Sequence, residues 1–216
     1  MKIAILGTGM VGTTIGSKMI ELGHKVKMGA RVAGNEKAAA WAGSAGPDAS
    51  QGTFAEAAAF GELAFNCTSG AGSMEALQQA GAANLKGKIL IDISNPLDFS
   101  KGMPPSLSVC NTDSLGERIQ KALPDTKVVK TLNTTSAPLM VDPGQLAGGD
   151  HTMFLCGDDA EAKARVLDLL KNGFGWKDVV DLGDITAARG QEMILPLWLR
   201  TWGTLKTANF NYKVVR

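Results

Sequence analysis

Three glycines near the start of the chain have a spacing that suits phosphate binding. Residues 3–16 read IAILGTGMVGTTIG, which places Gly7, Gly9 and Gly12 between an apolar strand pattern and a helical pattern. In that context the first glycine permits a tight turn and the second lets backbone approach a pyrophosphate. The third lets the helix pack close to the strand. The start of the helix offers free N–H groups to the phosphates. The motif therefore predicts a dinucleotide-binding site.

The end of the second expected strand indicates which dinucleotide would bind. NAD sites carry Asp or Glu there, to hold the ribose 2′-hydroxyl. This chain reads Met28-Gly29-Ala30-Arg31 instead, without a carboxylate, and Lys37 follows. A guanidinium pairs well with phosphate oxygens. We therefore expect NADP(H) rather than NAD(H), with Arg31 and Lys37 near the 2′-phosphate. The alternative is that Arg31 is a solvated surface side chain.

Few other side chains are arranged for chemistry. The chain has two histidines and three cysteines, and none of them falls in a cluster with metal-ligand spacing, so we expect no metal site. No Ser/His/Asp set, Cys/His pair or active-site lysine stands out. We interpret Cys67 as a small core residue rather than a redox thiol, and we expect His151 at the surface, the alternative being a position near the acceptor. The odd, widely spaced cysteines favour reduced thiols in the cytoplasm.

Strand and helix patterns alternate through the first two thirds of the chain. Strands are expected at residues 2–6, 25–28, 63–67, 89–93 and 127–132, and helices at 10–22, 35–41, 54–60, 73–80 and 115–122. Residues 42–51, rich in Ala, Gly and Ser, are expected to form a loop. This alternation predicts an α/β fold with a Rossmann-type, doubly wound parallel sheet. Such sheets bind ligands beyond the carboxyl ends of their strands.

The pattern changes after about residue 142. Strands are expected at 151–156 and 179–182, and between them Asp158-Asp159-Ala160-Glu161 predicts a capping box with Asp158 as the N-cap. Residues 185–207 follow as one long helical pattern with a broad apolar face, on which Arg189 and Glu192 are expected to pair. We therefore expect a Rossmann domain at 1–142. A small C-terminal α/β lobe at 143–216 would end in the long helix and serve the acceptor site or dimerisation.

Composition limits the classes of partner. The 216 residues are 44% hydrophobic and 20% charged, as in a globular protein. A net charge of +1 argues against broad binding to nucleic acid or anionic membranes. The longest apolar stretch, residues 193–199, is too short to cross a bilayer, and the start of the chain does not resemble a signal peptide. We expect a cytoplasmic protein without nucleic-acid or membrane partners.

Several segments resemble the NADPH-dependent reductases related to the F420-dependent NADP oxidoreductases. They are residues 29–31 (GAR), 128–134 (VVKTLNT), 156–159 (CGDD) and 188–197 (ARGQEMILPL). The resemblance implies a Rossmann domain with a small C-terminal lobe, usually dimeric, and NADP(H) as the cofactor. Two positions depart from the archaeal F420 enzymes, where Ser stands in place of Ala30 and His in place of Asn133.

The resemblance also implies site residues. The pyrophosphate and 2′-phosphate would be held by the glycine loop with Thr8, Met10, Val11 and Arg31, and Ala30 would lie beside the phosphate. Residues at the ends of later strands would surround the nicotinamide: Thr68, Ser94, Asn95, Asn133 and Ala137. Asn133 is the candidate for orienting the nicotinamide amide or the acceptor carbonyl. The alternative is that it caps or turns the strand end.

The chemistry implied is hydride transfer between NADP(H) and a planar acceptor, such as coenzyme F420 or a flavin. The cofactor carries that chemistry, and the protein stacks the two rings with the reacting carbons about 3–3.5 Å apart. The small residues Gly70-Ala71-Gly72 would leave room for the second ring. The alternatives are a reductase of a ferric chelate, quinone, imine or 2-hydroxy acid, and a non-catalytic NADP(H)-binding sensor or partner protein.

Overall fold

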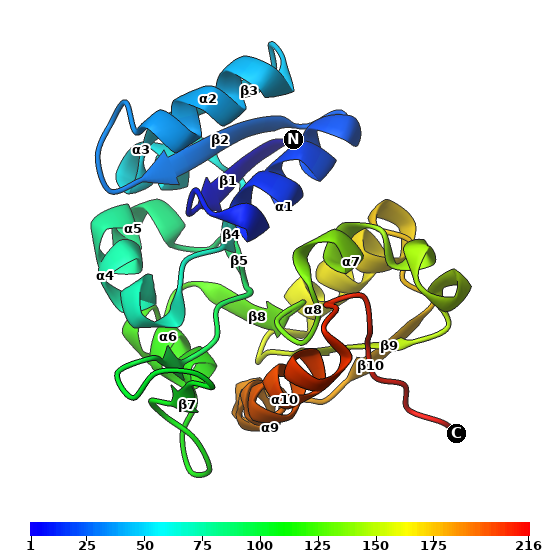
Figure 1. Ribbon diagram of the computed structural model, residues 1–216. Helices are drawn as coiled ribbons and strands as arrows, with labels where there is room; N and C mark the ends of the chain where they lie inside the picture. The colour runs from blue at the N-terminus through cyan, green and yellow to red at the C-terminus, as the bar shows by residue number, and fades with distance from the viewer.

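The chain folds around one eight-stranded sheet. A computed structural model describes residues 1–216. From edge to edge the sheet contains β3 (Ala49–Thr53), β2 (Lys25–Ala30), β1 (Lys2–Leu6), β4 (Leu63–Asn66), β5 (Ile89–Asp92), β8 (Lys127–Thr131), β9 (Thr152–Cys156) and β10 (Asp178–Asp181). The first six run parallel in the strand order of a Rossmann fold, which confirms the predicted fold class (Figure 1).

Helices cover both faces of this sheet because its strands alternate apolar side chains between the faces. In β1, Ile3 and Ile5 belong to one core cluster, whereas Ala4 and Leu6 belong to another. The first cluster is covered by α1 (Met10–Glu21), α2 (Glu36–Ala45), α7 (Ala137–Val141) and α8 (Ala160–Asp168). The second is covered by α3 (Phe54–Phe60), α4 (Gly70–Ala80), α5 (Ala82–Leu85), α6 (Leu115–Ala122) and α9 (Ala188–Met193). The carboxyl ends of the parallel strands therefore form one edge between two helical layers.

The predicted loop at residues 42–51 was wrong. Helix α2 continues to Ala45, and residues 49–53 form β3, which pairs with β2 alone at the edge of the sheet. The Ser50 hydroxyl also donates to the Val26 carbonyl. The sequence of β3, ASQGT, has no apolar alternation, since it is an edge strand held by backbone pairing rather than by a buried face. Nothing in its local pattern indicates a strand.

The later strands extend the same sheet. Strand β9 runs antiparallel to β8, and β10 runs parallel to β9. The boundary that we expected near residue 142 falls between α7 and a 3-10 turn at Pro143–Gln145. The cap of α8 is Asp159, which accepts a hydrogen bond from the Ala162 N–H, and not Asp158 as predicted. Asp158 instead accepts from the Ile185 N–H, a contact 27 residues away that local spacing does not reveal.

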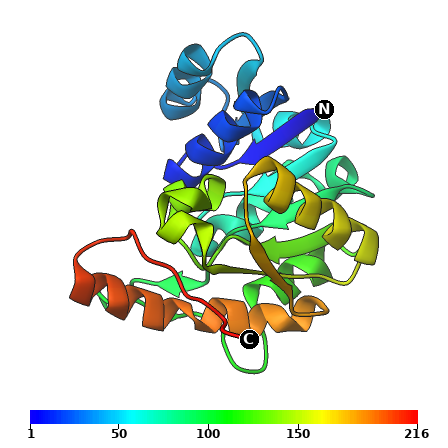
Figure 2. The ribbon, with the colours of Figure 1, turned by 90° about the vertical axis from the view of Figure 1, so that its right-hand side faces the viewer.

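The C-terminal helical segment is divided. It consists of a 3-10 turn at Ile185–Ala187, then α9, then α10 (Leu195–Leu205). Pro196 has no N–H, so the helical ladder cannot continue through it to Glu192. Helix α10 lies along one side of the molecule, and the C-terminal tail runs back over it (Figure 2). None of the helices combines the length and the apolar character that crossing a bilayer would need.

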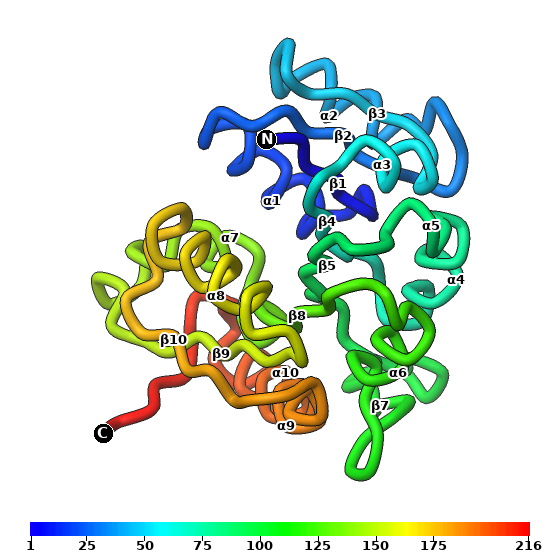
Figure 3. The backbone as a smooth tube through the Cα atoms, turned by 180° about the vertical axis from the view of Figure 1, so that it is seen from behind, coloured from blue at the N-terminus to red at the C-terminus, as the bar shows by residue number.

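The C-terminal tail is anchored at the start of β9. His151 is 3% exposed, so the expected surface position was wrong. Its two ring nitrogens lie 2.8 Å from Asn211 Nδ2 and 3.0 Å from the Pro143 carbonyl oxygen. The Thr152 N–H donates to the Tyr212 carbonyl. On the other side of the molecule, the small hairpin of β6 (Leu97–Asp98) and β7 (Ser106–Leu107) projects from the body, as the view from behind shows (Figure 3).

Candidate functional site

The glycine loop between β1 and α1 has the geometry that its sequence predicts. Gly7 has a φ of +121°, and a Cβ there would lie 2.7 Å from the Cys67 carbonyl oxygen. A Cβ on Gly12 would lie 2.2 Å from the Gly7 carbonyl oxygen. A Cβ on Gly9 would meet nothing within 4 Å. Gly7 and Gly12 are therefore required for close packing, whereas Gly9 faces open space that a ligand can approach.

The start of α1 is free to bind an anion. Gly9 is the N-cap, no side chain caps the helix, and its first turn contains no acidic residue. The N–H groups of the first helical turn therefore have no partner within the helix, and the positive end of the helix dipole faces the open side of Gly9. This arrangement fits a diphosphate, and it meets the physical requirement for a dinucleotide.

A cleft of about 310 Å³ begins at this loop. The cleft is lined by Gly7, Thr8, Gly9, Ala30, Arg31, Asn35, Phe54, Cys67, Thr68, Ser69, Gly72, Glu75, Ala76 and Gln79. It runs between the end of β2 and α4, beyond the carboxyl ends of the strands. Lys37 lines an adjoining hollow with Thr8, Gly9 and Met10. The structure thus brings both predicted cations to the vicinity of the glycine loop.

Arg31 has a partner in the cleft that the sequence did not suggest. Its side chain is 69% exposed, and its Nε lies 3.5 Å from Oε1 of Glu75 on α4. The same Glu75 oxygen accepts a hydrogen bond of 3.0 Å from Gln79 Nε2. The wall opposite Arg31 therefore carries a carboxylate. Sequence reasoning missed Glu75 because it is 44 residues away and lies on the exposed side of a helix.

The residues expected around the nicotinamide gather at the ends of β4, β5 and β8, but most point inward. Thr68 lines the cleft, and its hydroxyl donates to Asn66 Oδ1 at 2.6 Å. Ser94 is buried and donates to Asp92. Ala137, also buried, is the first residue of α7. Of these three residues, Thr68 is the one in the cleft wall.

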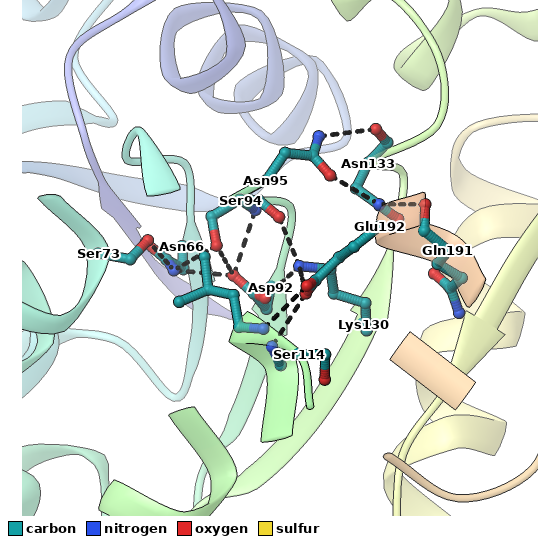
Figure 4. Close-up of polar contacts among 12 residues, drawn as sticks. Asn66, Ser73, Asp92, Ser94, Asn95, Ser114, Lys130, Asn133, Gln191 and Glu192 are labelled. Carbon is teal, nitrogen blue, oxygen red and sulfur yellow. Dashed lines mark hydrogen bonds and ion pairs between the residues drawn. The ribbon is translucent and has the colours of Figure 1, made fainter. Parts of the chain in front are cut away.

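Asn95 and Asn133 form a reciprocal pair between the ends of β5 and β8 (Figure 4). Asn133 Nδ2 donates to Asn95 Oδ1, and Asn95 Nδ2 donates to the Asn133 carbonyl, each at 2.9 Å. Asn133 Nδ2 also donates to the Gln191 carbonyl. Asn133 Oδ1 is buried and has no hydrogen-bond partner. The preceding residue, Leu132, has a φ of +63°, a conformation that costs a non-glycine residue energy and that turns the chain sharply here.

A buried ionic cluster lies below this pair, and the sequence analysis did not anticipate it. Lys130 is fully buried, with its Nζ 2.7 Å from Asp92 Oδ2 and 2.9 Å from Glu192 Oε1. It also donates to the Ser94 carbonyl. Burial alone would lower the pKa of Lys130, but the two carboxylates outweigh it and raise that pKa. The one signal in the sequence is weak, because Lys130 follows Val128 and Val129 in a strand that also contains Lys127 and Thr131.

This cluster joins four elements, which are β5, β8, α6 and α9. Glu192 on α9 accepts the N–H groups of Leu115 and Gly116 at the start of α6, at 2.8 and 3.0 Å. The expected Arg189–Glu192 pair is therefore wrong, because Glu192 turns inward to Lys130. Arg189 pairs with Glu117 on α6, with Nε 2.9 Å from Oε2, and this hydrogen bond lowers the pKa of Glu117.

The cysteines and the acidic groups do not form a reactive centre. Cys67 is buried beside the glycine loop, as expected of a core residue, and burial raises the pKa of its thiol. All three cysteines are unpaired. No three His, Cys, Asp or Glu side chains converge in a way that would hold a metal ion.

The fold and the glycine loop define a dinucleotide-binding protein of the Rossmann type. A sequence model of the family "NADP oxidoreductase coenzyme F420-dependent" matches residues 2–96. A crystal structure from Arthrobacter sp. FB24, of a candidate F420-dependent NADP reductase, is 56% identical over the whole length of both chains, with a TM-score of 0.94. The chain belongs to the F420-dependent NADP oxidoreductase family.

Two curated relatives match parts of the chain. The F420-dependent NADP reductase of Methanocaldococcus jannaschii is 32% identical over 114 residues, which are 52% of this chain and 50% of the relative. Metalloreductase STEAP3 of Rattus norvegicus is 29% identical over 202 residues, which are 91% of this chain and 38% of the relative. The chain therefore spans half or less of the length of these two relatives.

Proposed function

We propose that this chain is an oxidoreductase that transfers hydride between NADP(H) and a planar acceptor. The observation that carries the proposal is the uncapped start of α1, which opens through Gly9 onto a cleft containing Arg31. A diphosphate and a 2′-phosphate are the anions that such an arrangement accommodates. Membership of a family named for NADP oxidoreductases supports the same cofactor.

Each part of the site would hold one part of the cofactor. The backbone from Gly7 to Gly12, including the N–H groups of Thr8, Met10 and Val11, would bind the diphosphate. Arg31 and Lys37 would bind the 2′-phosphate, with Ala30 in the cleft wall beside it. The nicotinamide would then lie toward Thr68, over the ends of β4, β5 and β8. When bound, NADPH supplies the hydride, so the chain itself needs to orient the ring and exclude water.

The acceptor that we propose is coenzyme F420 or a flavin. The Arthrobacter and Methanocaldococcus relatives are both named as F420-dependent reductases. A flat ring also suits the small residue Gly72, whose added Cβ would meet one atom within 4 Å, Ser69 Oγ at 3.4 Å. A ferric chelate is a second candidate, because the rat relative is named a metalloreductase.

An acceptor panel tests the activity. The purified chain is mixed with NADPH and, in turn, with oxidised F420, FMN, a ferric chelate, a quinone and an imine, and NADPH oxidation is followed by absorbance. We expect the fastest oxidation with F420 or FMN. Oxidation with the ferric chelate alone would favour the second candidate. Tight NADPH binding without turnover on any acceptor would favour a sensor or partner protein and would overturn the proposed activity.

We propose a homodimer, supported by the apolar side chains that α10 leaves exposed, among them Leu197 and Leu205.

We also propose a cytoplasmic location, supported by three cysteines that remain unpaired. Subcellular fractionation of the native host, with detection of the chain by antibody, would check the location.

A further inference from the structure

The adenosine end of the cleft contains charges of both signs. Arg31 comes from the end of β2, and Glu75 comes from α4 on the opposite wall. Their contact of 3.5 Å spans the cleft, and Gln79 holds the same Glu75 oxygen from one helical turn further on. Strand β2 lies inside the sheet, and α4 packs against the second core cluster.

The two charges recognise different riboses. A guanidinium attracts a 2′-phosphate, whereas a carboxylate accepts a hydrogen bond from a 2′-hydroxyl and repels a phosphate. In sites that select NAD, the carboxylate stands at the end of the second strand. Here that position carries Arg31, and the carboxylate reaches the same cleft from α4. A phosphate that approaches Arg31 must therefore compete with Glu75 for the guanidinium.

We propose that Glu75 is a specificity-determining residue that weakens the preference for NADP(H) and lets NAD(H) bind in the same cleft. This inference rests on the proposed cofactor site. Glu75 contributes in two ways, because it neutralises part of the charge of Arg31 and offers an acceptor to the unphosphorylated ribose. The preference for NADP(H) is then set by the Arg31–Glu75 pair rather than by Arg31 alone.

The variant Glu75→Gln tests the role of the carboxylate. It removes the charge and keeps the size of the side chain, and the position is more than half exposed, so folding is unaffected. The dissociation constants of NADP+ and NAD+ are measured by isothermal titration calorimetry at low salt. We expect the dissociation constant of NADP+ to fall about fivefold or more, which means tighter binding, since one negative charge is removed a few ångströms from the phosphate. The dissociation constant of NAD+ should stay the same or rise.

Two other variants make the result decisive. Glu21→Gln is the matched control: Glu21 also forms an exposed ion pair, with Lys18 at 3.4 Å, but at the far end of α1, so both constants should stay unchanged. Arg31→Gln tests the cofactor site itself and should weaken NADP+ binding about tenfold or more.

The outcomes separate the inference from the proposed function. If Glu75→Gln leaves NADP+ binding unchanged or weakens it, Glu75 does not oppose the phosphate and the inference is wrong, although a large effect of Arg31→Gln would still support the cofactor site. If Arg31→Gln has no effect, or the unaltered chain binds neither coenzyme, the proposed cofactor site fails and the inference fails with it.

Discussion

At the scale of single residues, some residues of the site are explained by their neighbours in the sequence, whereas others are explained by residues far away in the chain. The three glycines of the loop are fixed by close packing and by the need for open backbone, and both requirements are visible in their spacing. Lys130 is different, because its environment comes from Asp92 and Glu192, which are 38 and 62 residues away. A lysine in a buried strand signals that partners exist, but it does not say which residues they are.

The substitution Lys130→Met should destabilise the protein strongly. It removes the one positive charge of the buried cluster and leaves Asp92 and Glu192 without a counter-charge, which costs about 3–5 kcal/mol in similar cases. Urea unfolding, followed by circular dichroism, measures the free energy of unfolding. The control Lys86→Met breaks an exposed pair with Asp125 and should cost less than about 1 kcal/mol. Equal losses in the two variants would contradict the role given to the buried cluster.

The effect of Lys130 on stability should depend on pH in one direction. Because the folded state raises the pKa of Lys130, its stabilising contribution is complete below the unfolded value, which is about 10.4. The contribution is lost as the pH rises through the higher folded value. As the pH rises, the stability gap between the unaltered chain and Lys130→Met should therefore narrow only in strongly alkaline solution. A gap that narrows as the pH rises from 6 to 8 would contradict this assignment.

At the scale of elements, helix α3 shows a cap whose sequence signal is complete. The Thr53 hydroxyl accepts from the Glu56 N–H, and the Glu56 carboxylate accepts from the Thr53 N–H at 2.7 Å. This reciprocal box follows β3 directly, so it turns the chain from the sheet edge into the helix. The hydrogen bond from the Thr53 backbone N–H is the main reason why the pKa of Glu56 is lowered, and the hydrogen bond from the Thr53 side chain lowers it further.

Removing this cap should have a moderate, pH-dependent cost. We expect Thr53→Ala to reduce the free energy of unfolding by about 1 kcal/mol at neutral pH. The backbone hydrogen bond from Thr53 is the main cause of the lowered Glu56 pKa and survives the substitution, whereas the smaller part from the Thr53 side chain is removed. That smaller part contributes stability above the ordinary carboxyl pKa and is lost as the pH falls through the depressed value. Thermal melts at several pH values measure this. Ser136→Ala is the control, since Ser136 is an N-cap whose side chain makes no capping bond.

At the scale of the whole molecule, α10 presents an apolar surface for which the single chain has no partner. Leu197 and Leu205 are 56% and 54% exposed on it. Trp198 lies deeper, and its ring stacks on Phe210 of the tail at 5.2 Å between centroids. The tail therefore covers one side of α10 and leaves the other side open, where the proposed second copy would bind.

The double substitution Leu197→Glu with Leu205→Glu should convert the proposed dimer into a monomer. Burying two carboxylates at an apolar interface is unfavourable, while both positions tolerate charge when they are exposed. Size-exclusion chromatography with light scattering gives the mass of each species. Phe99→Glu, at an exposed position in the β6–β7 hairpin, should leave the mass unchanged. If the unaltered chain is already monomeric, the proposed dimer does not exist.

How much could be predicted depended on how far apart the determining residues are. The β1–α1 turn and the alternation of strands and helices follow from residues that are neighbours in sequence, so the Rossmann fold and the position of the glycine loop could be predicted. Strand β3 could not be predicted, because its pairing with β2 rather than its composition makes it a strand. The break before α10 could have been foreseen from Pro196, since a missing N–H is a local property.

The sequence by itself determined that an open glycine turn precedes the first helix and that a guanidinium stands past the second strand, because both depend on short-range backbone geometry and residue type. Only the tertiary structure decided that Glu75 faces Arg31 and that Asp92 and Glu192 enclose Lys130. Those contacts arise when strands and helices distant in the chain pack together. Electrostatic interactions depend on distance in space, and the sequence order does not give that distance.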